Sequence, residues 1–208
     1  MEDYTILEQE IDPTIHYLYA TKGIQHTSHL LRTGDVDYAC RVAEANLQIC
    51  ESQHWTFLVS HCQRILGDLD TDAGQYTSAH THYDNALEIA RSISVRDVLI
   101  EALLARGRWY ARYMKDATSA FNDLNEALGY AVEGGYRIYE ADIRVALAWA
   151  GIVDSGQGSV DREKAKMEAE RALRMSEEMG YYWGKVDAEK VLKEISSHAK
   201  RPEVRIQK

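Results

Sequence analysis

The sequence has few residues that interrupt helices and no excess of positive charge. Only 2 of its 208 residues are proline, so long helices can run unbroken, because proline removes a backbone donor and clashes with the preceding turn. The formal net charge is −9. This charge argues against a dedicated nucleic-acid binder, which needs a basic surface, and against adsorption to an anionic membrane. We therefore expect neither nucleic acid nor membrane as a partner.

Cysteine is scarce, and long apolar runs are missing. The three cysteines, Cys40, Cys50 and Cys62, form no C-x-x-C pair, and scattered cysteines of odd number fit a reducing compartment better than a disulfide framework. No apolar run approaches the roughly 18 residues of a membrane span. The acidic residues 1–5 lack the basic and apolar regions of a secretory signal. These features predict a cytoplasmic protein.

A motif recurs about every 40 residues. In it, an alanine is followed by small or apolar residues four and seven positions later, which places all three on one helical face. The first copy departs from this pattern at Asn46. The register predicts that Ala86 and Ala127 lie in close helix contacts, and that Glu168 lies on an outer face that tolerates alanine. The alanines that open the copies are Ala39, Ala79, Ala120 and Ala165.

Apolar spacings of three and four also occur before each copy, so each copy is predicted to be the second helix of a pair. Glycines such as Gly34 and Gly74 mark the joints. The first helices are predicted at residues 13–33, 54–70, 95–114, 136–154 and 181–198. The second helices are predicted at 35–52, 75–93, 116–132 and 160–179. We expect residues 1–12 to be a leader or the end of a preceding element, 13–198 a repeat domain and 199–208 a basic tail.

The second repeat carries the residues of a known motif, namely Leu66, Gly67, Gly74, Tyr76, Ala79, Tyr83, Ala86 and Leu87. This pattern resembles the tetratricopeptide repeat (TPR), in the longer variety found in scaffold proteins and in sensor arrays of signalling ATPases. The resemblance covers about residues 13–198. It implies an all-α, right-handed superhelical solenoid of about four and a half antiparallel helix hairpins. Two departures are Thr27, at the place of the packing glycine, and the missing terminal prolines.

The architecture implied by this resemblance binds other proteins, because first helices line a concave groove that suits an extended peptide or a helix. Arg108 and Arg112 are four apart, so they share a helical face and are predicted to anchor an acidic segment. The alternatives are a solvated face, or pairing with acids of nearby repeats. The predicted groove residues are His61, Arg64, Glu101, Arg108, Arg112, Asp142 and Trp149.

Two function classes stay open on the sequence alone. One is a free-standing adaptor for a partner protein. The other is a regulatory or sensor segment of a larger signalling complex that contains an ATPase, a protease or a transcription regulator. The sequence has no phosphate-binding glycine loop, and its 8 histidines repeat none of the ligand spacings of structural zinc. Cys50 and Cys62 lie at core-type positions, where cysteine is inert. We therefore predict no enzymatic activity, no cofactor and no metal; an all-helical enzyme would need a pocket of convergent ionisable groups.

Overall fold

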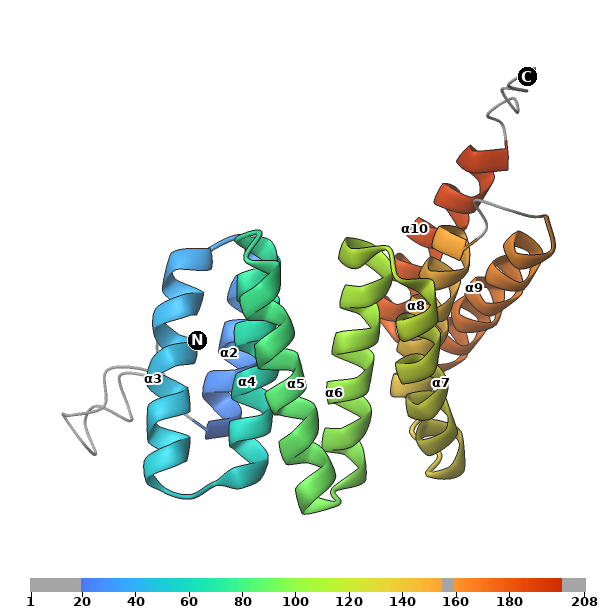
Figure 1. Cartoon of the computed structure of the whole chain (residues 1–208). Coiled ribbons are helices and arrows are strands. Elements are labelled where there is room, and N and C mark those ends of the chain that lie inside the picture. Colours follow the sequence, from blue (N-terminus) through green and yellow to red (C-terminus); the bar gives the residue numbers. More distant parts are fainter. Residues whose placement is uncertain (1–19, 155–158, 200–208) are drawn as a thin grey trace. The chain divides into compact units, whose positions relative to one another are not determined.

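A computed structural model describes residues 20–154 and 159–199, and all regular elements in these ranges are helical (Figure 1). This confirms the all-α fold class. The first helices of the pairs are α2 (Ala20–Thr33), α4 (Thr56–Asp72), α6 (Arg96–Trp109), α8 (Arg137–Asp154) and α10 (Tyr182–Ala199). The second helices are α3 (Val36–Ser52), α5 (Tyr76–Ile93), α7 (Ala117–Glu133) and α9 (Ser159–Met179). None of the described helices is both long enough and apolar enough to cross a membrane.

The predicted helix positions are confirmed for the described residues, with ends that agree to about two residues. The predicted start of the first helix, 13–19, lies outside the described residues, as do the leader at 1–12 and the tail beyond Ala199. One feature was not predicted. A π-helical turn, η1 (Tyr110–Met114), follows α6, where the sequence pattern indicated continuous α-helix.

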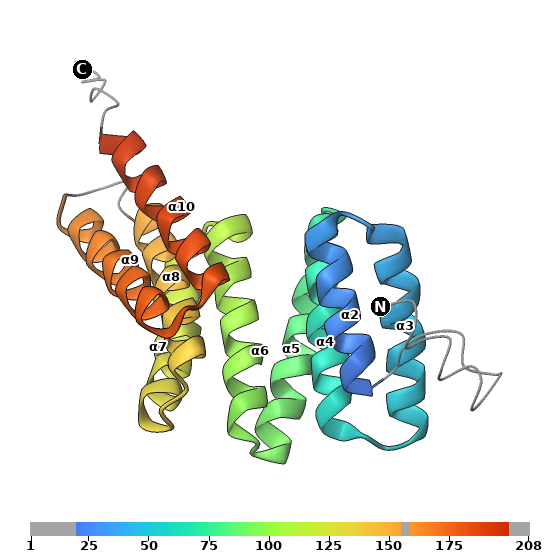
Figure 2. The same cartoon turned by 180° about the vertical axis from the view of Figure 1, so that it is seen from behind.

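Helix contacts divide the chain into two compact units, with the boundary between Ala105 and Arg106. The first unit holds α2 to α5 and most of α6, and the second holds the end of α6, η1 and α7 to α10. From α2 to α5 in the first unit, and from η1 to α10 in the second, each element packs on the next. First helices also pack on first helices, α2 on α4 in the first unit and α10 on α8 in the second (Figure 2).

The helices begin and end where local chemistry favours a turn. Asp116 caps α7, since its carboxylate accepts hydrogen bonds from the backbone N–H and the hydroxyl of Ser119, at 3.0 and 2.6 Å. Gly74 and Gly135 follow helix ends with φ of +73° and +69°, a conformation that glycine adopts without steric cost. These joints set consecutive helices antiparallel, as hairpins.

The repeat alanines lie inside the packed helices. Ala86 and Ala127 are fully buried, as are the alanines that open the copies, so the predicted register is confirmed. The motif glycines face the second helices. A methyl group added at Gly67 would lie 2.7 Å from the ring of Tyr83, and one added at Gly107 would lie 2.7 Å from the side chain of Leu124. The motif residues therefore set how closely the two helices of a hairpin approach.

The two departures in the first repeat have structural roles. Thr27 is fully buried, and its hydroxyl donates to the backbone carbonyl of Gly23 at 2.8 Å, so the polar group is satisfied within its own helix. Asn46 is also buried. Its Oδ1 accepts from the backbone N–H of Ala20 at 2.6 Å, and its Nδ2 donates to the carbonyl of Ala20 at 3.3 Å. Asn46 thus ties α3 to the start of α2.

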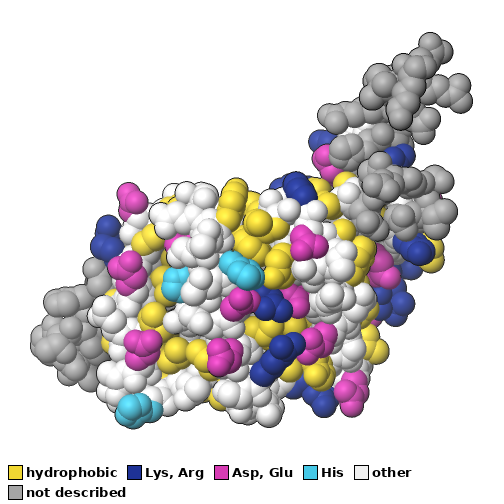
Figure 3. Space-filling model, viewed as in Figure 1, with side chains coloured by type: hydrophobic (Ala, Val, Ile, Leu, Met, Phe, Trp, Pro, Cys, Tyr) yellow, Lys and Arg dark blue, Asp and Glu magenta, His cyan; other side chains and the backbone are white. Residues whose placement is uncertain are grey.

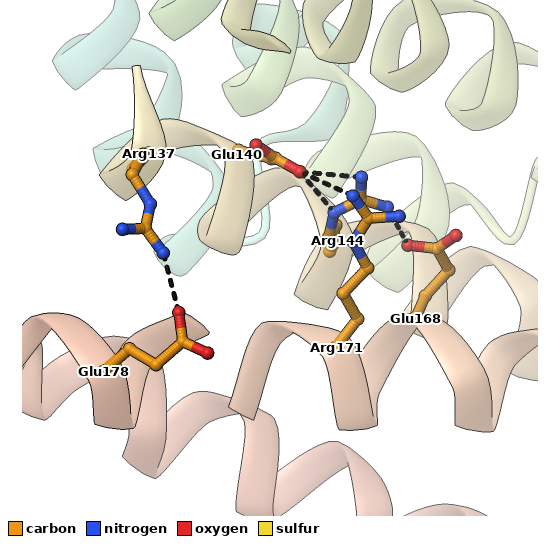
Figure 4. Close-up of polar contacts among 6 residues, drawn as sticks. All are labelled: Arg137, Glu140, Arg144, Glu168, Arg171 and Glu178. Atoms are coloured by element: carbon orange, nitrogen blue, oxygen red, sulfur yellow. Dashed lines mark hydrogen bonds and ion pairs between the residues drawn. The ribbon is translucent and has the colours of Figure 1, made fainter. Parts of the chain in front are cut away.

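A network of charges joins α8 to α9 and corrects one prediction (Figure 4). The side chain of Arg144 is only 5% exposed, and it donates to Glu140 at 2.7 and 2.9 Å and to Glu168 at 2.6 Å. A buried guanidinium needs such partners, because it has lost its water. The prediction that Glu168 lies on an indifferent outer face is therefore wrong. Arg171, 3.4 Å from Glu140, and the surface pair of Arg137 with Glu178 complete the link.

Candidate first-helix interface

The structure brings the seven predicted groove residues together in two clusters, one in each unit. All seven lie on first helices or on η1. The first cluster consists of His61 and Arg64 on α4 and Glu101 on α6. The second cluster consists of Arg108 on α6, Arg112 on η1, and Asp142 and Trp149 on α8.

In the first cluster, one carboxylate contacts an imidazole and a guanidinium. Oε2 of Glu101 lies 3.1 Å from Nδ1 of His61 and 3.5 Å from Nε of Arg64. Arg64 also donates from Nη1 to Oδ2 of Asp68 at 3.1 Å. All four side chains are at least partly buried, which strengthens their attraction relative to pairs in open water. Arg64 therefore has carboxylate partners on both α4 and α6 within the first unit.

Tyr83 on α5 and Asp68 on α4 link the first cluster to α5, and neither was among the predicted groove residues. The hydroxyl of Tyr83 donates to Oδ1 of Asp68 at 2.8 Å and lies 3.2 Å from Oγ1 of Thr71. Burial, and then the charge of Asp68, raise the pKa of Tyr83, so the phenol stays protonated and keeps its role as donor. Tyr83 was recognised only as a packing position of the motif, and the apolar pattern carries no signal for its hydroxyl.

In the second cluster, Asp142 connects three elements. Its Oδ2 lies 3.8 Å from Nη2 of Arg108, and both of its oxygens accept from the hydroxyl of Tyr181, at 3.2 and 3.3 Å. Tyr181 lies in the turn before α10. Arg108 therefore pairs with an acid of the next repeat, in the way that one of the alternatives predicted.

Arg112 has a different environment from Arg108. Its guanidinium carbon lies 5.1 Å from the ring centroid of Trp149, within the range of a cation–π interaction. Trp149 is half-buried and packs against the core shared by α8, α9 and α10. The Arg112 side chain is exposed, and within the described ranges it forms neither an ion pair nor a hydrogen bond. Arg112 is thus a positioned charge without a neutralising carboxylate.

Charged side chains are mixed on the surface rather than segregated. Figure 3 shows acidic and basic side chains interspersed among hydrophobic ones on the face viewed. Next to Arg112, Tyr113 is 40% exposed and Met114 46% exposed. The arrangement offers polar, aromatic and aliphatic contacts together, which is the composition of protein interfaces.

Two of the three cysteines are buried. Cys50 and Cys62 are buried in the core of the first unit, as predicted. Burial raises the pKa of Cys62 and that of Cys50, which favours the protonated and poorly nucleophilic thiol. Across the described residues, no group of three or more histidine, cysteine or acidic side chains could hold a metal ion.

Comparison with models of known protein families gives no match for this chain. Comparison with curated proteins gives none either. The likeness to the tetratricopeptide repeat therefore depends on the motif residues and on the helix packing described above.

Proposed function

We propose that this chain is a TPR-like protein-binding module, and that the surface formed by its first helices binds a segment of a partner protein. The observation that supports the proposal most is the contact between successive first helices. Glu101 on α6 reaches His61 on α4 in the first unit, and Asp142 on α8 reaches Arg108 on α6 in the second. Neighbouring first helices thereby form a shared surface in each unit.

The character of this surface favours binding over mere packing. A helix face that only served the core would be apolar and closed, whereas these faces carry partly exposed arginines, acids and aromatic rings. Arginine, tyrosine and tryptophan are the residues that contribute most to protein–protein affinity. In the proposed arrangement the hairpins continue into a right-handed superhelix, whose inner side is the first-helix surface.

The proposal assigns a binding role rather than a catalytic one. The two roles that the sequence left open, adaptor and regulatory or sensor segment of a larger signalling complex, would use the same surface. They differ in what the bound partner does. The binding surface is therefore the first thing to test.

Site-specific photocrosslinking tests which face meets a partner. A photoreactive phenylalanine analogue replaces Tyr113 on η1 in one variant, and Met167 on α9 in a control variant. Both side chains are exposed, 40% and 61% respectively. After irradiation in lysate of the source cells, we expect a discrete crosslinked partner from position 113 and none from position 167. Equal labelling from both positions, or labelling from 167 alone, would contradict the proposed surface.

A further inference from the structure

We propose that Arg112, held over Trp149, anchors a single carboxylate in an acidic partner segment that carries an apolar residue beside the acid. This inference rests on the proposed function and adds the chemistry of the partner. Arginines of the second unit differ in the kind of partner that their side chains contact. Arg106, Arg108 and Arg144 each have a carboxylate partner, while Arg112 has an aromatic ring and, within the described residues, no carboxylate.

The contact with Trp149 leaves the charge of the guanidinium unneutralised, because an indole ring carries no formal charge. A guanidinium carries five N–H donors in a planar fork. Arg112 can therefore still donate two parallel hydrogen bonds to a carboxylate while it lies over the ring. The ring also restricts the side chain before any partner arrives, so less conformational entropy is lost on binding.

The backbone that carries Arg112 is held where its turn ends. The N–H groups of Lys115 and Asp116 both donate to the carbonyl of Tyr110, which closes the π-helical turn. Lys115 adopts a left-handed conformation with φ of +57°, and Asp116 then caps α7 through Ser119. Arg112 therefore projects from a turn held by hydrogen bonds at its end, and such π-helical turns are frequent at functional sites.

Charge favours one carboxylate over a phosphate group. Arg112 supplies one unneutralised positive charge, which matches one monoanionic group. Asp142 lies on the same face of α8, about two turns before Trp149, and the whole chain carries a net charge of −9. Both features repel a doubly charged phosphate more than a carboxylate. The exposed Tyr113 and Met114 directly after Arg112 supply the apolar contact.

Peptide selection on the full chain tests this chemistry. A phage library that displays random 12-residue peptides is selected on the immobilised wild-type chain, on Arg112→Gln, and on Arg174→Gln. Arg174 is an exposed arginine of α9, so the last variant loses the same charge from a second helix. We expect enrichment of Asp or Glu beside an apolar residue on the wild type and on Arg174→Gln, and loss of this acidic preference on Arg112→Gln.

A double-mutant cycle then tests whether Arg112 contacts the acidic residue of the peptide directly. The most enriched peptide is synthesised, together with its Glu→Gln or Asp→Asn form. Removal of either partner should weaken binding by about ten- to a hundredfold, the range for a hydrogen bond to a charged group. On Arg112→Gln, the change in the peptide should have little further effect, because the contact is already gone.

The outcomes separate the two proposals. Peptides enriched without acidic preference, or the same acidic preference on Arg112→Gln, would overturn the inference while the proposed function stands. A cycle in which the two changes add independently would also overturn it. If no bait enriches any peptide, both the inference and segment binding by this chain fail.

Discussion

Arg106 at the end of α6 binds Asp123 on α7 through two parallel hydrogen bonds, both 2.8 Å long. The side chain of Asp123 is 7% exposed and that of Arg106 is 18% exposed. The pair therefore lies largely out of water, beside the close contact of Gly107 with Leu124. It connects α6, which carries Arg108 of the second cluster, to α7, the second helix of the same hairpin.

Burial should decide how much this pair contributes to stability. Asp123→Ala should lower the free energy of unfolding by about 2–4 kcal/mol, because it leaves a largely buried guanidinium without its carboxylate. Glu178→Ala removes an ion pair with the same 2.8 Å separation, but its side chains are 54% and 64% exposed. That variant should lose less than about 1 kcal/mol. Urea denaturation measures both, and equal losses would refute the role given to burial.

Two glycine substitutions should change stability in opposite directions. Gly107→Ala drives a methyl group into Leu124, so we expect a loss of about 1–3 kcal/mol. Gly129 lies within α7, and a methyl group there meets no atom within 4 Å. Gly129→Ala should therefore stabilise the chain by about 0.5–1 kcal/mol, because alanine loses less backbone entropy in a helix. Thermal unfolding checks the signs; stabilisation by both substitutions would show that the hairpins do not approach as closely as described.

Glu168→Ala should be costly although its side chain is partly exposed. It removes one of the two carboxylates that neutralise the buried Arg144, so we expect a loss of about 1–2 kcal/mol. Glu170→Ala, two residues along the same helix, removes only an exposed pair with Lys166 and should lose less than about 1 kcal/mol. If the denaturation midpoints of the two variants coincide, the α8–α9 network does not stabilise the fold.

The cap at Asp116 should make a pH-dependent contribution. Hydrogen bonds from the side chain and backbone of Ser119 lower the pKa of Asp116 below its ordinary value of 3.8. A depressed folded-state pKa adds stability above the ordinary value, and this stability disappears as the pH falls through the folded-state pKa. Asp116→Ala should lose about 1 kcal/mol near neutral pH, and its difference from wild type should shrink below pH 3.8. Denaturant titrations at several pH values test this, and a difference independent of pH would exclude the ionised cap.

The sequence predicted the helices well because the apolar period and the turn glycines are local signals. The alanine spacing places Ala86 and Ala127 on one face of their helices, and both are buried in the structure as predicted. The π-helical turn at Tyr110–Met114 was missed because the spacing of apolar residues does not determine which carbonyl accepts the hydrogen bond of each backbone N–H. The role of Glu168 was predicted wrongly for a similar reason, because its contribution to stability depends on Arg144 from another helix.

The candidate interface was only partly predictable. Spacing put Arg108 and Arg112 on one face, but their difference arises from α8, which supplies a carboxylate to the first and an indole ring to the second. Tyr181 and Asp68 joined the clusters through hydroxyl and carboxylate contacts between helices. Contacts of this kind depend on side-chain geometry in three dimensions, for which a single sequence carries no periodic signal.

The most direct test of the first-helix surface is the affinity of the partner crosslinked through position 113 for Arg112→Glu and Arg174→Glu. Both variants change the net charge equally, whereas Arg108→Glu would also place a second carboxylate beside Asp142. Circular dichroism and the denaturation midpoint should match wild type for both. We predict that Arg112→Glu loses binding, that Arg174→Glu keeps it, and that wild-type affinity falls as salt screens exposed charges over about 8–10 Å. A folded Arg112→Glu variant that binds the partner at wild-type strength would contradict the account.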